Sequence, residues 1–186
     1  ISACLVGSEM CIRDRLCTLE DLGAEVYLTP TMEWLFYVNY LNQKRAWEKK
    51  NYSEFLSFWI KEKYQKFDAH NFEHCFTDLL SNGKETSIKK ILNYAAPYLH
   101  SSCEGEAILS IGKSIDLLKN GIDGVINVMP FTCMPGTIVT AILKKVKEVY
   151  SNLPYLSIAY DGQEDPFLRT NLEAFLCQAR EHKKTS

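Results

Sequence analysis

The sequence predicts an α/β fold, in which a parallel sheet is flanked by helices and the first half carries a helical insertion. Short β-branched apolar runs alternate with longer segments whose apolar residues recur every three or four positions. The connections between them are short, as is typical of parallel strands joined through helices. With 46 % hydrophobic residues in 186, the chain can form one domain with a sizeable core.

The first segment is set apart because residues 1–15 resemble a translated sequencing adapter rather than a protein. We therefore leave them out of the expected fold, as one would leave out an expression scar. The native domain is then expected to cover residues 16–186. It is expected to be the C-terminal fragment of a longer protein, with the opening strand of its sheet missing.

The first half of the native part predicts mainly helix. Residues 22–30 indicate a helix end, a glycine stop and a short strand, and residues 33–99 form the expected helical insertion. An aromatic stripe at helical spacing could line a cofactor, but packing between helices is the commoner cause. Its members are Trp34, Val38, Leu41, Phe55 and Trp59.

The second half alternates helix and strand. A helix closed by Gly121 precedes a strand over residues 124–129, and a second strand covers residues 155–160. Asp165 is expected to cap the last helix, with Pro166 at its first position. The apolar faces of the three helices comprise Ile108, Ile111, Ile115 and Leu118, then Ile138, Ile142, Val146 and Val149, then Leu168, Leu172, Phe175, Leu176 and Ala179.

Cys133 lies where the strand over residues 124–129 gives way to a helix, with Pro135 suited to the first helical turn. The positive end of the helix favours a thiolate there. In open α/β sheets, ligands bind beyond the carboxyl ends of the strands. Cys133 is therefore a candidate metal ligand, although many free cysteines in such turns are small buried hydrophobic residues.

Three further side chains are candidates at the same edge of the sheet. Cys103 and Glu106 lie where a helix is expected to begin. The carboxylate of Glu106 could serve only to stabilise the positive end of the helix dipole, and the thiol of Cys103 could serve only to pack against neighbouring residues. Asp161 follows the second strand, in a loop over residues 161–165 that lacks the spacing of a calcium loop. We expect Asp161 to be the functional member of that loop.

Composition narrows the classes of function. A formal net charge of −2 gives no electrostatic reason to expect nucleic acid binding, and no apolar run is long enough to span a bilayer. The cysteines outside residues 1–15 are scattered and odd in number, which favours a reducing cytoplasm over a disulfide framework. The histidines have no metal-ligand spacing, and the sequence contains no phosphate-binding glycine loop.

The segments Glu104–Lys113, Gly121–Thr137 and Tyr160–Asp165 resemble the C-terminal part of activase-linked relatives of 2-hydroxyacyl-CoA dehydratase. This superfamily includes benzoyl-CoA reductase-type and double-cubane-cluster proteins, and its members are often called CoA-substrate-specific enzyme activases. The resemblance implies a Rossmann-like domain of an anaerobic redox protein. In such proteins, an ATP-hydrolysing activase delivers a low-potential electron to an iron–sulfur partner.

The resemblance also implies roles for individual residues. Cys133 would be a thiolate ligand of a [4Fe–4S] or double-cubane cluster, with Pro130 and Gly136 beside it and Cys103 as a second candidate ligand. Asp161 and Glu106 remain catalytic candidates. The other ligands are expected upstream of residue 16, and ATP would bind only to the activase.

Three functional hypotheses remain open at this point. The first is a fragment of an ATP-dependent reductase or dehydratase that acts on a CoA thioester or a similar small molecule. The second is a non-catalytic domain that docks the activase, and the third is a thiol enzyme with Cys133 as nucleophile, although no histidine is near it in sequence. The expected partner is an activase domain or subunit. The chain could also form a homodimer.

Overall fold

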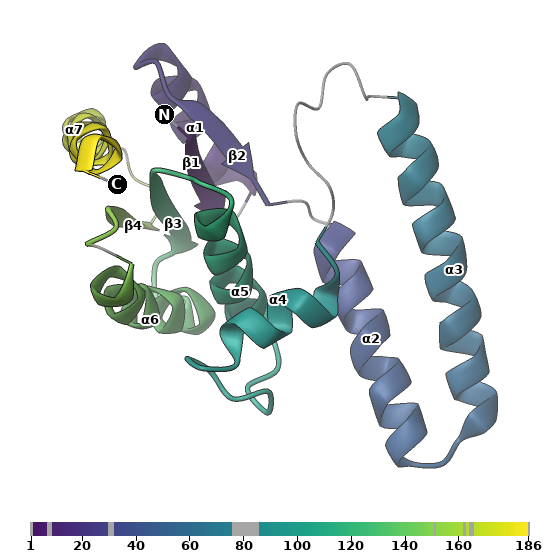
Figure 1. Cartoon of the computed structure of the whole chain (residues 1–186). Coiled ribbons are helices and arrows are strands. Elements are labelled where there is room, and N and C mark those ends of the chain that lie inside the picture. The colour runs from purple at the N-terminus through teal and green to yellow at the C-terminus, as the bar shows by residue number, and fades with distance from the viewer. Residues whose placement is uncertain are drawn as a thin grey trace. The chain divides into compact units, whose positions relative to one another are not determined.

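The structure is a computed structural model that describes residues 2–6, 9–29, 32–75, 86–150, 152–161, 163 and 166–185. The chain forms two compact units, one made of Ile1–Thr29 with Ile91–Ser186 and the other of Pro30–Lys90. The first unit contains all the strands that the structure describes, and the second is helical (Figure 1). Within the described residues, no helix combines the length and the apolar character needed to cross a bilayer.

The first unit is built on a parallel sheet of four strands. They are β1 (Ser2–Val6), β2 (Glu25–Leu28), β3 (Gly124–Pro130) and β4 (Tyr155–Tyr160). Their order across the sheet is β2-β1-β3-β4, and every neighbouring pair is parallel. The mixed α/β class expected from the sequence is therefore confirmed.

The expectation that the opening strand is missing is wrong. Strand β1 fills the place between β2 and β3, where Cys4 is in register with Tyr27 on one side and Val125 on the other. This strand lies within residues 1–15, whose adapter-like sequence predicts no part of the fold. The apolar stretch Ser2–Val6 is nevertheless compatible with a central strand.

Helices cover both faces of the sheet (Figure 1). Helices α1 (Glu9–Asp21) and α7 (Leu168–Thr185) pack on one face, where Ile126 and Val128 of β3 join a buried cluster with Leu172 and Phe175. Helices α5 (Glu106–Lys119) and α6 (Met134–Val149) pack on the other face. Since successive side chains of a strand alternate between faces, Asn127 faces the side of α6.

Most expected elements of the second half are confirmed. Strand β4 has the expected bounds, β3 is one residue longer than expected, and the apolar face of α7 is almost fully buried. The exception is Val149, which is exposed because it ends α6 beyond the buried face of that helix. The expected cap at Asp165 lies outside the described residues. The buried face of α6 comprises Val139, Ile142, Leu143 and Val146.

The second unit contains an antiparallel helical hairpin made of α2 (Met32–Glu48) and α3 (Tyr52–Cys75). Helix α4 (Ile88–Ala95) begins in this unit and ends in the first. These helices occupy much of residues 33–99, and α2 and α3 are separated by a tight turn in which Lys50 has a φ of 57°. Its aromatic stripe is not uniformly packed, because Trp34 and Trp59 are exposed.

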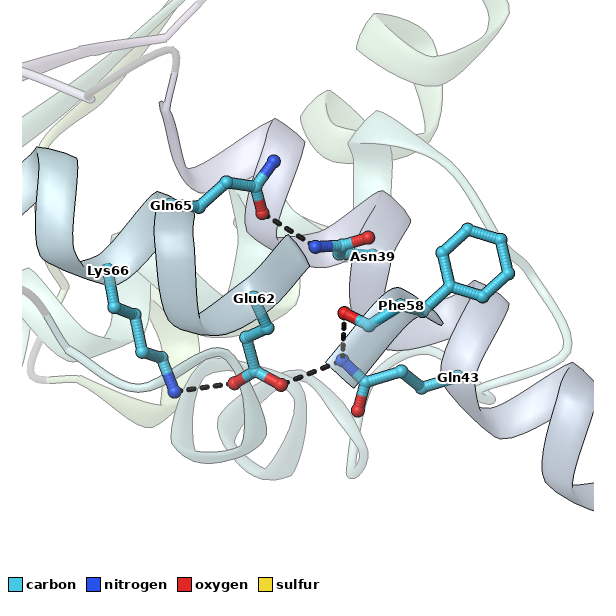
Figure 2. Close-up of polar contacts among 6 residues, drawn as sticks. All are labelled: Asn39, Gln43, Phe58, Glu62, Gln65 and Lys66. Carbon is cyan, nitrogen blue, oxygen red and sulfur yellow. Dashed lines mark hydrogen bonds and ion pairs between the residues drawn. The ribbon is translucent and has the colours of Figure 1, made fainter. Parts of the chain in front are cut away.

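A polar ladder joins the two helices of the hairpin (Figure 2). Asn39 Nδ2 donates to Gln65 Oε1 over 2.6 Å, and Gln43 Nε2 donates to Glu62 Oε2 over 2.7 Å. Burial raises the pKa of Glu62, but hydrogen bonds from Lys66 and Gln43 and the charges of Lys66 and Lys89 outweigh it. The pKa of Glu62 therefore lies below its ordinary value of 4.5.

Candidate functional site at the carboxyl edge of the sheet

The turn after β3 is held by backbone hydrogen bonds. The N–H of Phe131 donates to the carbonyl oxygen of Tyr160 over 2.7 Å, which continues the pairing of β3 with β4 by one residue. The next residue, Thr132, has a φ of 65°, which is uncommon for a β-branched residue. The N–H of Cys133 then donates to the carbonyl oxygen of Pro130 over 3.1 Å and closes the turn.

Cys133 is half-buried and is the N-cap residue of α6, with φ −67° and ψ 112°. Its carbonyl oxygen accepts hydrogen bonds from the backbone N–H of Thr137 over 3.0 Å and from Thr137 Oγ1 over 2.8 Å. Its thiol makes no capping hydrogen bond within the described helix, and Pro135 lies in the first turn as expected. The sulfur therefore stands at the positive end of α6 without a capping role.

A buried polar network fixes the position of this turn. Asn127 is only 3 % exposed, and its Nδ2 lies 3.1 Å from the carbonyl oxygen of Gly136, 3.0 Å from Thr140 Oγ1 and 3.3 Å from Ser157 Oγ. The hydroxyl groups of Thr140 and Ser157 are 2.6 Å apart. One amide thus ties β3 to the first turn of α6 and to β4.

Pro130 and Gly136, both expected beside a cofactor, differ in their surroundings. Pro130 is exposed at the end of β3. Gly136 is buried, and a Cβ atom there would lie 2.6 Å from both Cβ and Sδ of Met129. The close approach of α6 to β3 therefore accounts for the glycine without any ligand.

Asp161 lies beside the Cys133 turn at the same edge of the sheet, as expected. Strands β3 and β4 are parallel and Pro130 is in register with Tyr160, so the residues that follow them emerge together. The side chain is exposed, and its Oδ1 accepts a hydrogen bond from the N–H of Gln163 over 3.0 Å. Gly162, Glu164 and Asp165 of this loop lie outside the described residues.

Cys103 and Glu106 lie at the start of α5, and both side chains are exposed. A helix between parallel strands runs back along the sheet, so α5 also begins at the carboxyl edge. The backbone of Cys103 is anchored by a 2.9 Å hydrogen bond from its N–H to the carbonyl oxygen of His100. Across the described ranges, however, no three His, Cys, Asp or Glu side chains are grouped closely enough to hold a metal ion.

The strand order places the Cys133 turn at a reversal of the chain's path through the sheet. From β1 the chain moves to β2 on one side, and it then returns past β1 to β3 on the other. Such a switch point between neighbouring parallel strands is the usual place for a ligand in an open α/β sheet. The turn that follows β3 lies at this point.

The sequence interpretation missed two kinds of residue at this edge. One is Asn127, whose lone amide in an apolar strand is a signal of a specific internal partner. Phe131 and Met134, on either side of Cys133 in sequence, are 65 % and 71 % exposed. Both are large apolar side chains that remain in water beside the Cys133 turn.

No protein-family model, curated protein or solved structure matches this chain.

Proposed function

We propose that the chain is the cluster-bearing part of an ATP-dependent reductase or dehydratase, in which Cys133 is a thiolate ligand of an iron–sulfur cluster. The substrate would be a CoA thioester or a similar small molecule, and an activase would supply the electrons. The single observation that supports this most is the half-buried thiol at the N-cap of α6, beside the switch point of the sheet.

Within the mixed α/β class, we propose that the fold is Rossmann-like. The parallel order β2-β1-β3-β4 and the helices on both faces support this class. The cytoplasm is the proposed compartment. It is supported by the free thiols of Cys17, Cys103, Cys133 and Cys177, because a reducing environment preserves such thiols.

We propose that Cys133 forms one corner of a cluster site. A [4Fe–4S] or double-cubane cluster would supply one-electron chemistry at low potential, and it needs several cysteine ligands. Cys133 would hold one iron, while Cys103 is the second candidate and the remaining ligands would come from other segments or chains. The network around Asn127 would keep the turn rigid, and the apolar side chains of Phe131 and Met134 would reduce the polarity around the sulfur.

Two carboxylates are proposed to act on the substrate side. Asp161 emerges next to the Cys133 turn, and its hydrogen bond from Gln163 holds its side chain against its own loop. It could orient a ligand or accept a proton there. Glu106 is exposed in the first turn of α5, at the same edge of the sheet, and is the alternative for this role.

Anaerobic reconstitution of the full chain with iron and sulfide tests the proposal. We expect Cys133→Ala to lose or convert the cluster, as measured by bound iron and low-temperature EPR. Cys177→Ala is the matched control, because Cys177 is a free and exposed thiol on α7. Equal iron content and identical spectra in the wild type and in Cys133→Ala would reject Cys133 as a ligand.

A second candidate function is a non-catalytic module that docks the activase. The exposed side chains of Phe131 and Met134 favour it, because an apolar surface beside a rigid turn suits a protein partner. In this case Phe131→Glu would weaken binding of a purified activase, whereas Cys133→Ala would leave it unchanged. If neither variant alters binding, the docking function is rejected.

A further inference from the structure

Helix α3 has two apolar faces. One packs against α2 along the hairpin, and the other meets α2 at Tyr52, whose ring centroid lies 6.2 Å from that of Trp47. The inner face carries half-buried Phe55 and Phe58, together with Glu62 and Gln65 of the polar ladder (Figure 2). The other apolar face is exposed along the same helix. We name it the outer stripe, and its members are Tyr52, Leu56, Trp59, Ile60, Tyr64 and Phe67, which are between 43 % and 68 % exposed.

The outer stripe is a single continuous face. Its members are spaced by three or four residues, or lie next to one another at Trp59 and Ile60, so they line one side of a helix over four turns. Lys63 lies on the same side, with its ammonium group 5.5 Å from the ring of Trp59. An apolar face of this length is not needed for the hairpin itself, because the opposite side of α3 already packs on α2.

We propose that the outer stripe is a dimerisation surface, on which α3 of a second copy of the chain packs in antiparallel orientation. This inference is independent of the proposed function. Aromatic side chains bury about 150–250 Å² each, so six half-exposed side chains leave roughly 500–700 Å² to be covered. Two such faces give an interface of about 1,000–1,400 Å², at the lower end of specific interfaces, and the dimer should have a micromolar Kd.

The spacing of the stripe favours a copy of itself as the occupant. Tyr52 and Phe67 are equally distant in sequence from the midpoint between Trp59 and Ile60. Leu56 and Tyr64 are also equally distant from this midpoint to within one residue. An antiparallel two-fold therefore sets Tyr52 against Phe67 of the second copy, and Leu56 beside Lys63 and Tyr64. A two-fold interface requires such self-complementarity.

Charge favours the antiparallel orientation and a protein partner. Parallel helices would place the two copies of Lys63 side by side, whereas the antiparallel pairing places each beside residue 56 of the other copy. Helix α3 carries three lysines and four carboxylates, so it lacks the cationic excess of a helix that binds an anionic membrane. Tyrosine and tryptophan are also the side chains most enriched where proteins bind one another.

Sedimentation of the full chain from about 1 to about 300 µM tests the proposal. We expect a monomer at the low end and a discrete dimer at the high end. Tyr52→Glu and Phe67→Lys should each raise the dimer Kd at least about 10-fold, because each would place an unpaired charge against an apolar side chain of the other copy. Val149→Glu is the matched control, since it makes the same kind of change at an exposed apolar residue of α6 and should leave the Kd unchanged.

Mixing the two charged variants tests the orientation. In the antiparallel pairing, Glu at position 52 of one chain meets Lys at position 67 of the other, so an equimolar mixture should regain the dimer. Helix content by circular dichroism should be unchanged in both variants, because both positions are exposed. Failure of the mixture to dimerise would overturn the antiparallel pairing.

Three other outcomes would overturn the proposal as a whole. The first is a chain that stays monomeric at about 300 µM, which would mean that something else covers the stripe. The second is a dimer that both charged variants leave intact. The third is a monomer that instead co-sediments with vesicles of phosphatidylcholine and phosphatidylserine, because that result would assign the stripe to a lipid surface.

Discussion

The side-chain amide of Asn127 donates a hydrogen bond of 3.1 Å to the carbonyl oxygen of Gly136, so one residue of β3 holds the first turn of α6 in place. Gly136 in turn lets α6 approach Met129 more closely than any side chain would allow. Together these contacts fix the turn that carries Cys133. The candidate site therefore depends on two buried residues that would not touch a ligand.

Replacing the amide should destabilise the first unit. Asn127→Ala removes a buried amide donor, while the carbonyl of Gly136 keeps its 2.9 Å hydrogen bond from Thr140 Oγ1 and the hydroxyl groups of Thr140 and Ser157 still bond each other, so we expect the free energy of unfolding to fall by about 1–2 kcal/mol in urea titrations. Thr140→Ser is the control, because it keeps the hydroxyl and should cost less than about 1 kcal/mol. Equal losses in the two variants would contradict the role assigned to Asn127.

The central position of β1 gives a second prediction. Cys4 lies between β2 and β3 in the sheet, and a proline there would remove an N–H from the ladder. We expect Cys4→Pro to lower the free energy of unfolding by about 3 kcal/mol, measured by chemical denaturation. Cys4→Ser keeps the N–H and serves as the control. If the two variants are equally stable, Ser2–Val6 is not a central strand in solution.

Glu62 gives a prediction about pH. Its pKa is lowered in the folded chain, so the carboxylate adds stability above its unfolded value near 4.5. That contribution should decline as the pH falls below 4.5 and should vanish once the pH is below the folded pKa. The wild type should therefore be more stable than Glu62→Gln at neutral pH, and the gap should close in acid.

Thermal unfolding of both proteins between pH 3 and 7 measures this gap. Lys44→Gln is a suitable control, because Lys44 lies on the same hairpin and its 4.0 Å ion pair with Glu48 is exposed on both sides. A gap between the wild type and Glu62→Gln that stays constant down to pH 3 would show that the Glu62 pKa is not lowered.

Local pattern predicted the second half of the chain well. Strand β4 and the buried face of α7 follow from apolar periodicity and from the turn residues that bound them. Val149 was misplaced because the spacing of a helical face says nothing of where the helix leaves the core. The cap at Asp165 stays a prediction.

Other features depend on contacts that a sequence does not contain. The adapter-like sequence of residues 1–15 gives no sign of strand β1, yet a short apolar segment of suitable length can pair in a parallel sheet. Spacing alone also cannot tell which side of the insertion helices is buried and which is exposed. It therefore predicted that Trp59 packs against another helix, whereas Trp59 is exposed. Likewise, the sequence placed Cys103 and Cys133 at helix starts, but it could not tell whether they meet.

The pairing of β1 with β3 has a consequence for the order of folding. Ala3 is in register with Gly124, so the whole α2–α3 hairpin lies in the loop that must close before the sheet is complete. The hairpin has contacts that are local in sequence and can form on its own early, whereas the central strand pair must wait for a long and entropically costly closure. We expect refolding in two kinetic phases, with helical signal regained first and burial of the sheet last.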